Sequence, residues 1–345
     1  MDVTVAICTW NRVSLLERTL ERLLELTIPA DVRWQLWVVD NNSTDATPDL
    51  LRSVQHKFPL RILHEPQAGL SFARNRVLRE ATADLLAWTD DDVLVDTGWL
   101  TALVNASREF PNGSVFGGPI EPWFLEPPAP ELIEAFPSLA VGYCGLPDEI
   151  PAGPVGAEIP VWGANMAFRR AAIDGLLFNT HLGPSPTFVA GGDEVDFMRQ
   201  VRQRGGAVVW CPGMRIKHCV PPERATLPYL EKYTRAKGCE HVLLANRDTH
   251  RSGAEVAVPN WLWRAYATAL VREWAGRFGP AQLSGRLWSG PAPASNSSRR
   301  VRQLVGVRER CFLGGMIEGF RKQRRPRTVT MDPRPAVHSS VGQRP

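Results

Sequence analysis

The chain of 345 residues lacks the closely spaced cysteine pairs of many metal and redox modules. Its six cysteines are dispersed, and no two of them form a Cys-x-x-Cys pair. Such pairs are typical of zinc ribbons and thioredoxin-like sites, so the sequence argues against both classes. Dispersed cysteines without a disulfide framework predict free thiols and a reducing, cytoplasmic location.

Long apolar segments are also missing. No uninterrupted apolar run approaches the roughly 20 residues that a membrane-spanning helix needs. Met1 and Asp2 lead into a short apolar run without the basic flank of a signal peptide. These absences agree with the cytoplasmic location that the cysteines predict.

Charge is small in sum but unevenly distributed. The chain has a formal net charge of +4, yet residues 299–327 alone carry +8 and residues 1–298 carry −5. A basic end on an acidic body suits an anionic surface, and a solvated flexible tail is equally compatible with it. The acidic body and the absence of interleaved aromatic and basic motifs count against a nucleic-acid partner.

Apolar runs alternate with helical patterns through the first ninety residues. Strands are predicted over residues 3–8, 34–39, 60–64 and 84–89, with helices over 14–26, 47–57 and 70–80 between them. This order predicts an α/β fold with a mainly parallel, doubly wound sheet. Further along, we expect a strand over 114–120, a proline-rich loop to about residue 160, a helix over 193–204 and a strand over 207–210.

Polar side chains follow three of the predicted strands, at residues 9–12, 40–42 and 90–92. The carboxyl ends of parallel strands meet at one edge of a sheet, where ligands usually bind. The last cluster is three consecutive aspartates, whose mutual repulsion a cation would relieve. Oxygen ligands suit Mg²⁺ or Mn²⁺, which also bind substrate phosphates. Seen alone, the triplet would more often be a turn before a helix.

A resemblance supports the first interpretation. The ordered motifs resemble family 2 glycosyltransferases, which are inverting enzymes of bacterial type with the GT-A fold, a Rossmann-like α/β architecture. The motifs are Cys8-Thr9-Trp10-Asn11-Arg12, Asp40-Asn41-Asn42-Ser43-Thr44-Asp45, Gly69-Leu70-Ser71-Phe72-Ala73-Arg74-Asn75, Asp90-Asp91-Asp92, Gly163-Ala164-Asn165-Met166-Ala167-Phe168-Arg169, Gly192-Asp193-Glu194 and His218. They cover residues 3 to about 235, and their order is more specific than any one of them.

The resemblance implies a role for each candidate residue. Asp92 and His218 are expected to hold Mn²⁺ or Mg²⁺. The acidic pair occurs in the reverse of the family's usual order, so both Glu194 and Asp193 are candidates for the catalytic base. The residues expected to bind the nucleoside-diphosphate sugar are Thr9, Asn11, Arg12, Asp40, Asn42, Arg74, Asp90, Asp91 and Asn165.

Elementary chemistry is compatible with these roles and with simpler ones. Asp40 can accept a hydrogen bond from a uracil-type N–H, or it can cap a helix or turn. Arg74 offers a planar fork for phosphate, or it is a solvated helix residue. A sugar hydroxyl needs a proton acceptor within hydrogen-bond reach, which Glu194 or Asp193 could supply.

The reaction implied by the resemblance is a single displacement at the anomeric carbon with inversion. A hexosyl-type sugar would pass to a hydroxyl of a saccharide or lipid-linked acceptor, in polysaccharide or glycoconjugate biosynthesis. Two alternatives are a nucleotidyltransferase and a catalytically inactive sugar-nucleotide-binding protein. No glycine- and lysine-rich phosphate loop follows the first strand, which counts against the former, and the acidic motifs appear intact, which counts against the latter.

Three regions are predicted: a catalytic domain over residues 1–235, a basic amphipathic helical extension over 236–325 and a disordered tail over 326–345. Helices are expected near residues 261–278 and 300–320, with tryptophans and arginines close to helical spacing. Such helices suit peripheral contact with the inner face of the plasma membrane, or packing against the catalytic domain. The sequence leaves both open.

Overall fold

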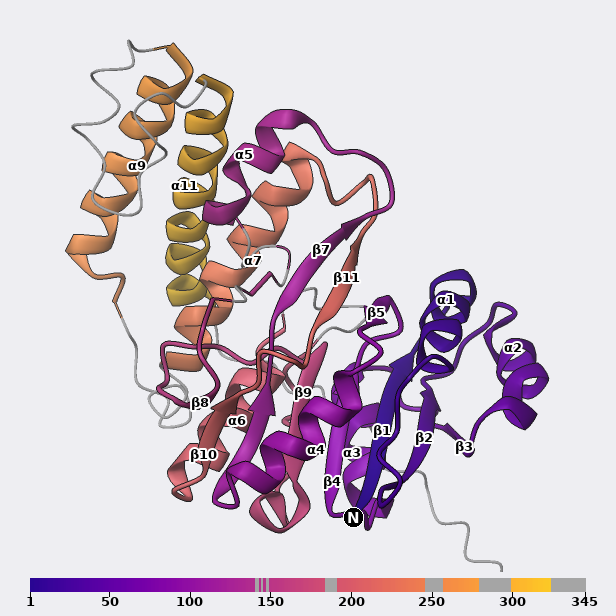
Figure 1. Cartoon of the computed structure of the whole chain (residues 1–345). Coiled ribbons are helices and arrows are strands. Elements are labelled where there is room, and N and C mark those ends of the chain that lie inside the picture. Colours follow the sequence, from indigo (N-terminus) through magenta and orange to yellow (C-terminus); the bar gives the residue numbers. More distant parts are fainter. Residues whose placement is uncertain are drawn as a thin grey trace, which may run out of the picture.

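An eight-stranded sheet forms the centre of the molecule (Figure 1). The computed structural model describes residues 1–139, 143, 145–146, 149–183, 191–245, 257–278 and 299–323. The strand order is β3-β2-β1-β4-β9-β6-β10-β8. These strands are β1 (Asp2–Thr9), β2 (Arg33–Asp40), β3 (Leu60–His64), β4 (Leu85–Thr89), β6 (Gly113–Gly117), β8 (Gly153–Val155), β9 (Asn165–Arg169) and β10 (Ala207–Trp210). β1 to β4 run parallel, and β9 is antiparallel to both of its neighbours.

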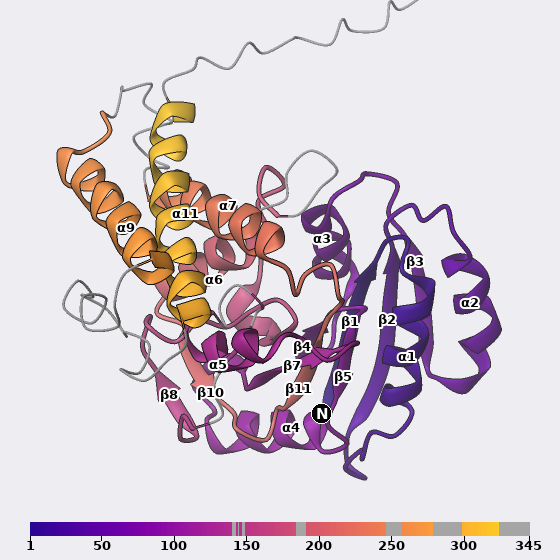
Figure 2. The ribbon, with the colours of Figure 1, turned by 90° about the horizontal axis from the view of Figure 1, so that it is seen from above.

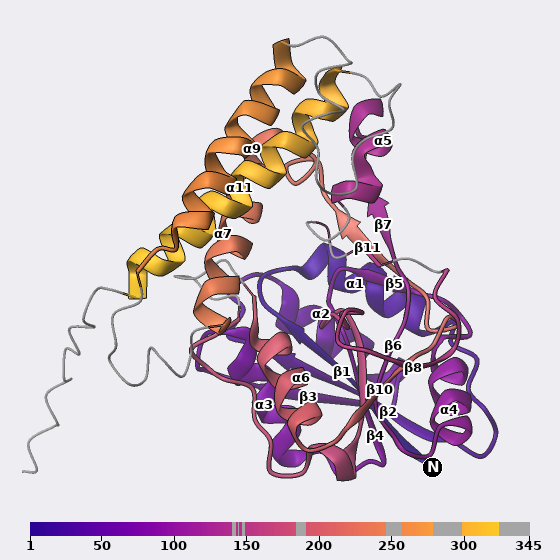
Figure 3. The same ribbon diagram turned by 90° about the vertical axis from the view of Figure 1, so that its left-hand side faces the viewer.

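Helices cover both faces of this sheet because successive side chains of a strand point to opposite faces. In β2, Leu36 and Val38 belong to the core on one face, and Trp37 and Val39 to the core on the other. Helices α1 (Val13–Leu23), α2 (Thr47–Val54) and α4 (Trp99–Glu109) pack on the first face, and α3 (Leu70–Glu80) and α6 (Asp193–Gln203) on the second. Figure 3 shows α3 and α6 across the sheet from α4. The predicted doubly wound α/β fold is confirmed.

A second, three-stranded sheet corrects one prediction. The strand expected over 114–120 ends at Gly117, and after Gly118 and Pro119 the chain continues as β7 (Ile120–Phe124) in the order β5-β11-β7. Proline cannot donate to a sheet ladder, so the strand is interrupted there. The other members are β5 (Val93–Val95) and β11 (Ile216–Val220).

The expectation of an unstructured loop to residue 160 is likewise wrong. This stretch contains β7, β8 and helix α5 (Pro130–Leu139). Its prolines were read as loop signals, but Pro130 stands at the first position of α5, where a missing N–H costs nothing.

Three long helices form the carboxyl-terminal part: α7 (Leu227–Ala245), α9 (Asn260–Phe278) and α11 (Arg299–Gln323). Figure 2 places them at the opposite end of the molecule from α1, α2 and β3. α7 and α11 pack closely, since a Cβ at Gly238 would overlap the Phe312 carbonyl and one at Gly315 the Arg235 carbonyl. The helices expected near 261–278 and 300–320 are thus present. None of the described helices is long and apolar enough to cross a membrane.

The expected boundary between residues 235 and 236 falls inside α7, which runs through it without interruption. Leu230 of α7 also packs with Leu132 of α5 and Leu304 of α11 in one apolar cluster. The division into three regions stays a prediction, and residues 326–345 lie outside the described part of the chain.

Candidate active site

The polar ends of β1 and β4 face a cavity of about 500 Å³ at the carboxyl edge of the sheet. Parallel pairing aligns Thr9 with Asp40 across β1 and β2, and the Asn41 amide donates to the Thr9 carbonyl at 2.9 Å. The predicted site residues that line the cavity are Thr9, Arg12, Arg74, Asp90, Asp91, Asp92, Glu194 and His218. Residues from five separate motifs therefore meet in one place.

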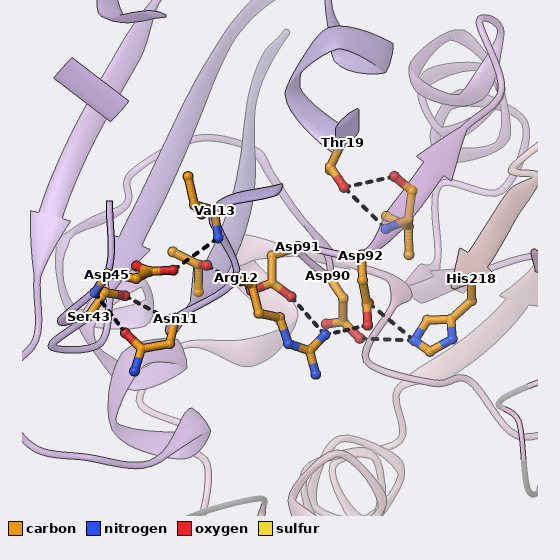
Figure 4. Close-up of polar contacts among 12 residues, drawn as sticks. Asn11, Arg12, Val13, Thr19, Ser43, Asp45, Asp90, Asp91, Asp92 and His218 are labelled. Atoms are coloured by element: carbon orange, nitrogen blue, oxygen red, sulfur yellow. Dashed lines mark hydrogen bonds and ion pairs between the residues drawn. The ribbon is translucent and has the colours of Figure 1, made fainter. Parts of the chain in front are cut away.

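Two of the three aspartates after β4 are held by the end of β1 and the loop that follows it (Figure 4). The Thr9 hydroxyl donates to the Asp91 carboxylate at 2.7 Å, and the Arg12 guanidinium contacts Asp91 at 3.3 Å and also pairs with Asp92. Burial raises the pKa of Asp91 to about 7, although the charge of Arg12 opposes the shift. Burial also opposes ionisation of Asp92, but His218 and Arg12 outweigh it and lower the pKa of that carboxyl.

One imidazole completes a group that could hold a metal ion. His218 lies on β11 opposite Val93 of β5, and the amide of the next residue, Cys219, donates to the Asp92 carbonyl at 2.9 Å. The His218 Nε2 atom is 3.4 Å from an Asp92 carboxylate oxygen and 3.9 Å from one of Asp90. Ligand atoms of these three residues lie within 4.8 Å of one another. Two carboxylates and an imidazole suit Mn²⁺, and carboxylates also suit Mg²⁺.

A second pair of carboxyl groups, Asp193 and Glu194, begins α6 next to α3. The Arg74 guanidinium of α3 lies 2.6 Å from a carboxylate oxygen of Asp193 and 3.5 Å from one of Glu194. Both Arg74 and Asp193 are almost fully buried. Gly163 leaves the space for this arginine, because a Cβ at that position would overlap its guanidinium.

The two acids of α6 differ in environment. Burial raises the pKa of Asp193 to about 7, against the charge of Arg74. Burial opposes ionisation of Glu194 as well, but a hydrogen bond with Asp193 and the charges of Arg74 and Lys237 prevail and lower its pKa to about 2. Glu194 lines the cavity, whereas Asp193 lies behind it against Arg74.

Three predicted donor-binding residues lie in the loops beside the cavity and do not line it. The Asn11 side-chain oxygen accepts from the Thr44 amide at 2.7 Å, and Asp40 accepts from the Ser43 amide at 3.0 Å. Asn42 is exposed and has a positive φ of 69°. These contacts connect the loops after β1 and β2, and the donor-binding roles of the three residues stay predictions.

Asn165 also lies outside the cavity lining. Its side-chain oxygen accepts from the Trp99 indole at 2.8 Å, and its amide nitrogen donates to the carbonyls of Pro119 at 3.2 Å and Met214 at 2.6 Å. The side chain is buried and does not line the cavity. It joins β9 to α4 and two loops, and its donor-binding role stays a prediction.

The sequence interpretation missed the aromatic side of the cavity. Tyr143, Trp162, Tyr229 and Tyr233 line it, as does Lys237. Tyr229, Tyr233 and Lys237 follow one another at intervals of four residues, which is the spacing of one helix face. That signal was readable, but no helix was predicted over the range that α7 occupies.

Comparison with known proteins points to one family. Residues 4–122 match the family described as glycosyl transferase family 2. This match and the similar proteins below support a family 2 glycosyltransferase. The protein is a glycosyltransferase with the GT-A fold, as the motifs predicted.

Similar proteins include the succinoglycan biosynthesis protein ExoM of Rhizobium meliloti (strain 1021). It is 28% identical over 263 residues, which is 72% of this chain and 77% of that protein. Validoxylamine A glucosyltransferase of Streptomyces hygroscopicus subsp. limoneus is 33% identical over 141 residues, covering 39% of this chain and 31% of that protein.

Solved structures support the fold. The mannosyltransferase PcManGT from Pyrobaculum calidifontis, in complex with GDP-Man and Mn²⁺, aligns with a TM-score of 0.56 at 19% identity, over 92% of this chain and 86% of that chain. Residues 1–349 of S. aureus TarS, in complex with UDP, align with a TM-score of 0.50 at 16% identity, over 93% and 92% of the two chains.

The buried position of Arg74 predicts a pH-dependent loss of stability when it is replaced. In Arg74→Met, Asp193 and Glu194 lose the cation that lowers the pKa of both. The folded-state pKa of Asp193, already above its unfolded value of about 4, rises further, and the lowering of the Glu194 pKa is reduced, so the variant loses stability relative to the unmodified chain as the pH rises. We expect a deficit of about 3–5 kcal/mol in the free energy of unfolding at pH 8, and a smaller one at pH 5.

Urea denaturation at the two pH values measures this deficit. Arg199→Met is the matched control, because Arg199 pairs with Asp196 at 3.0 Å on the same helix but has a largely exposed side chain. Its cost should stay below about 1 kcal/mol at both pH values. Equal deficits for Arg74→Met at pH 5 and pH 8 would show that Arg74 does not balance the two acids.

Proposed function

We propose that the enzyme is a metal-dependent, inverting glycosyltransferase that moves a sugar from a nucleoside diphosphate to a hydroxyl acceptor. The observation that carries the proposal is the pairing of two acidic clusters in one cavity. Asp90, Asp92 and His218 form a group that could hold a metal, and Glu194 faces the same cavity from α6. The names of the similar proteins, a glucosyltransferase and a mannosyltransferase bound to GDP-Man and Mn²⁺, support sugar transfer from a nucleotide donor.

On the donor side, Asp90, Asp92 and His218 would hold Mn²⁺ or Mg²⁺. The bound ion would neutralise negative charge on the diphosphate leaving group. Arg12 adds a fixed cation beside Asp91 and Asp92. The Thr9 hydroxyl donates to the Asp91 carboxylate and restrains it. The charged groups that would surround the diphosphate are therefore already in position before it binds.

On the acceptor side, Glu194 is the group that would receive the hydroxyl proton. It lines the cavity and its lowered pKa keeps it ionised at neutral pH. Asp193 and Arg74 would position it from behind, which favours Glu194 over Asp193 as the base. Attack from this side, opposite the diphosphate, would invert the anomeric carbon.

The class of acceptor follows from one relative. The name of ExoM, a succinoglycan biosynthesis protein, supports a saccharide acceptor in polysaccharide biosynthesis, carried on a lipid or free.

Replacing a proposed metal ligand should remove the effect of the metal on nucleotide binding. For the unmodified chain we expect Mn²⁺ to increase the thermal stabilisation that UDP or GDP produces, because an ion held by Asp90, Asp92 and His218 would supply positive charge for the diphosphate. Asp92→Asn should lose most of the Mn²⁺-dependent part. Asp174→Asn, at an exposed acid that pairs with Arg170 at 3.1 Å, is the control and should retain it. A full Mn²⁺ effect in Asp92→Asn would refute the assignment of this ligand.

Replacing the base should abolish transfer and spare donor binding. Glu194→Gln keeps the shape of the side chain but removes the proton acceptor, so we expect transfer to fall by about 10²–10⁴-fold. Nucleoside-diphosphate release in the presence of an oligosaccharide acceptor mixture measures transfer, and thermal shift measures donor binding. Asp193→Asn should reduce transfer less. The reverse ranking of the two variants would make Asp193 the base.

The proposal extends to a membrane surface for a lipid-linked acceptor. One face of α9 carries exposed apolar side chains at helical spacing, which are Trp263, Leu270, Val271 and Trp274. Arg321 of α11 lies 5.5 Å from the Trp263 ring. The single acid of α9, Glu273, is turned toward Arg310 of α11. A stripe with tryptophan and arginine and without acids suits an anionic lipid surface.

Vesicle co-sedimentation of the full chain tests this contact. The chain should pellet with phosphatidylglycerol vesicles, and Trp263→Ser with Trp274→Ser should weaken binding by about tenfold or more, since two indole faces lose their burial. Trp261→Ser is the control, because this exposed tryptophan points roughly 200° away from Trp263 around the helix. Equal pelleting of the double variant and the unmodified chain would reject the membrane contact.

A further inference from the structure

We infer that the aromatic side of the cavity is the acceptor subsite, and that it binds a saccharide through the apolar faces of its pyranose rings. This inference rests on the proposed function and adds to it the chemistry that recognises the acceptor. We call the four residues Tyr143, Trp162, Tyr229 and Tyr233 the aromatic wall. All four line the cavity, and none belongs to the motifs that carry the family resemblance.

Three of the rings form a continuous row. The rings of Tyr229 and Tyr233 are stacked with centroids 5.7 Å apart and planes inclined by 17°. The ring of Tyr143 contacts that of Tyr229, with centroids 6.1 Å apart, and it also stacks on Phe136, so this buried ring supports the row. Tyr229 and Tyr233 lie one turn apart on α7, which fixes their relative position.

Lys237 lies close both to this row of rings and to Glu194, the proposed base. The Lys237 Nζ atom lies 5.8 Å from the Tyr233 ring centroid and 5.6 Å from that of Trp162. A Cβ at Gly191 would lie 3.5 Å from this Nζ atom and 3.7 Å from a carboxylate oxygen of Glu194. A sugar seated beside Tyr233 is therefore close to the carboxylate that would take its proton.

Sugar chemistry matches this surface. A pyranose ring presents C–H groups on its faces and hydroxyl groups around its edge, so a flat aromatic face can cover the former while leaving the latter free. Hydroxyls at the edge can then reach Glu194 and the Lys237 ammonium. A purely apolar ligand would remove water from these two charged groups and offer them no hydrogen bond in return, which is costly.

The other candidate for an aromatic surface is the base of the donor nucleotide, which also has a flat face. The residue expected to read that base, Asp40, lies at the end of β2 and does not line the cavity; its neighbour Asn41 lines it on the side of β1 and α3, with Thr9 and Gly69. The aromatic wall instead lies on α7 and the segments before β9, beside Glu194. Its position thus favours the acceptor, and the experiment separates the two.

Saturation-transfer NMR of the full chain, without nucleotide, tests the subsite. The probes are cellotetraose, laminaritetraose and maltotetraose, which present glucose rings in three linkages. At least one should bind, with the strongest transfer to its ring C–H protons. Tyr233→Ala and Tyr233→Leu should each weaken binding by about fivefold or more, whereas Tyr233→Phe, which keeps the ring, should stay within about twofold.

Thermal shift with UDP or GDP and Mn²⁺, on the same proteins, separates the outcomes. Unchanged nucleotide stabilisation in Tyr233→Ala supports the acceptor assignment and shows that the variant is folded. If nucleotide stabilisation is lost in Tyr233→Ala but kept in Tyr233→Phe, the aromatic wall binds the donor base and the inference fails. It also fails if none of the three saccharides binds, or if the ring-deleting variants bind as the unmodified chain does. Saccharide binding without any nucleotide effect in the unmodified chain would refute the proposed function alone.

Discussion

The structure depends on the balance of charge around five carboxyl groups, four that line one cavity and one directly behind it. Three follow β4 and two begin α6, and most of them are buried. Arg12 pairs with two of the first group and Arg74 with both of the second. Without these partners the repulsion and desolvation of the acids would oppose folding. The two arginines therefore explain how a fold can keep an anionic site in a partly closed cavity, ready for a cation and a diphosphate.

The first half of the fold could be predicted because its signals are local. Apolar runs such as residues 60–64 and 207–210 coincide with β3 and β10, and Gly69 directly precedes α3. The convergence of Thr9 and Asp90–Asp92 followed from the parallel order of the strands, since that order fixes which strand ends meet. His218 could be placed only through the family resemblance, because its approach to Asp92 depends on the pairing of β11 with β5.

What could not be predicted depends on contacts between distant segments. The burial of Arg74 needs α6, which is more than a hundred residues away, and a glycine that leaves the guanidinium its space. Asn165 carries a family motif, yet its side chain is taken up by Trp99 and two carbonyls. Strands β7 and β11 belong to a small sheet whose members come from three separate parts of the chain. Single-sequence patterns describe neighbours along the chain and contain no information on such pairings.

The proposed donor and acceptor chemistries draw on different parts of the chain. The residues that β1 and β4 supply to the proposed donor site lie before residue 122, where the family match ends. The aromatic wall and the helices packed behind it lie after that residue. α7 is held by close backbone packing on α11 at Gly238 and Gly315, while its Tyr229, Tyr233 and Lys237 side chains line the cavity. Under the proposed assignment, exchanging side chains along one helix would change the choice of acceptor and leave the donor residues of β1 and β4 untouched.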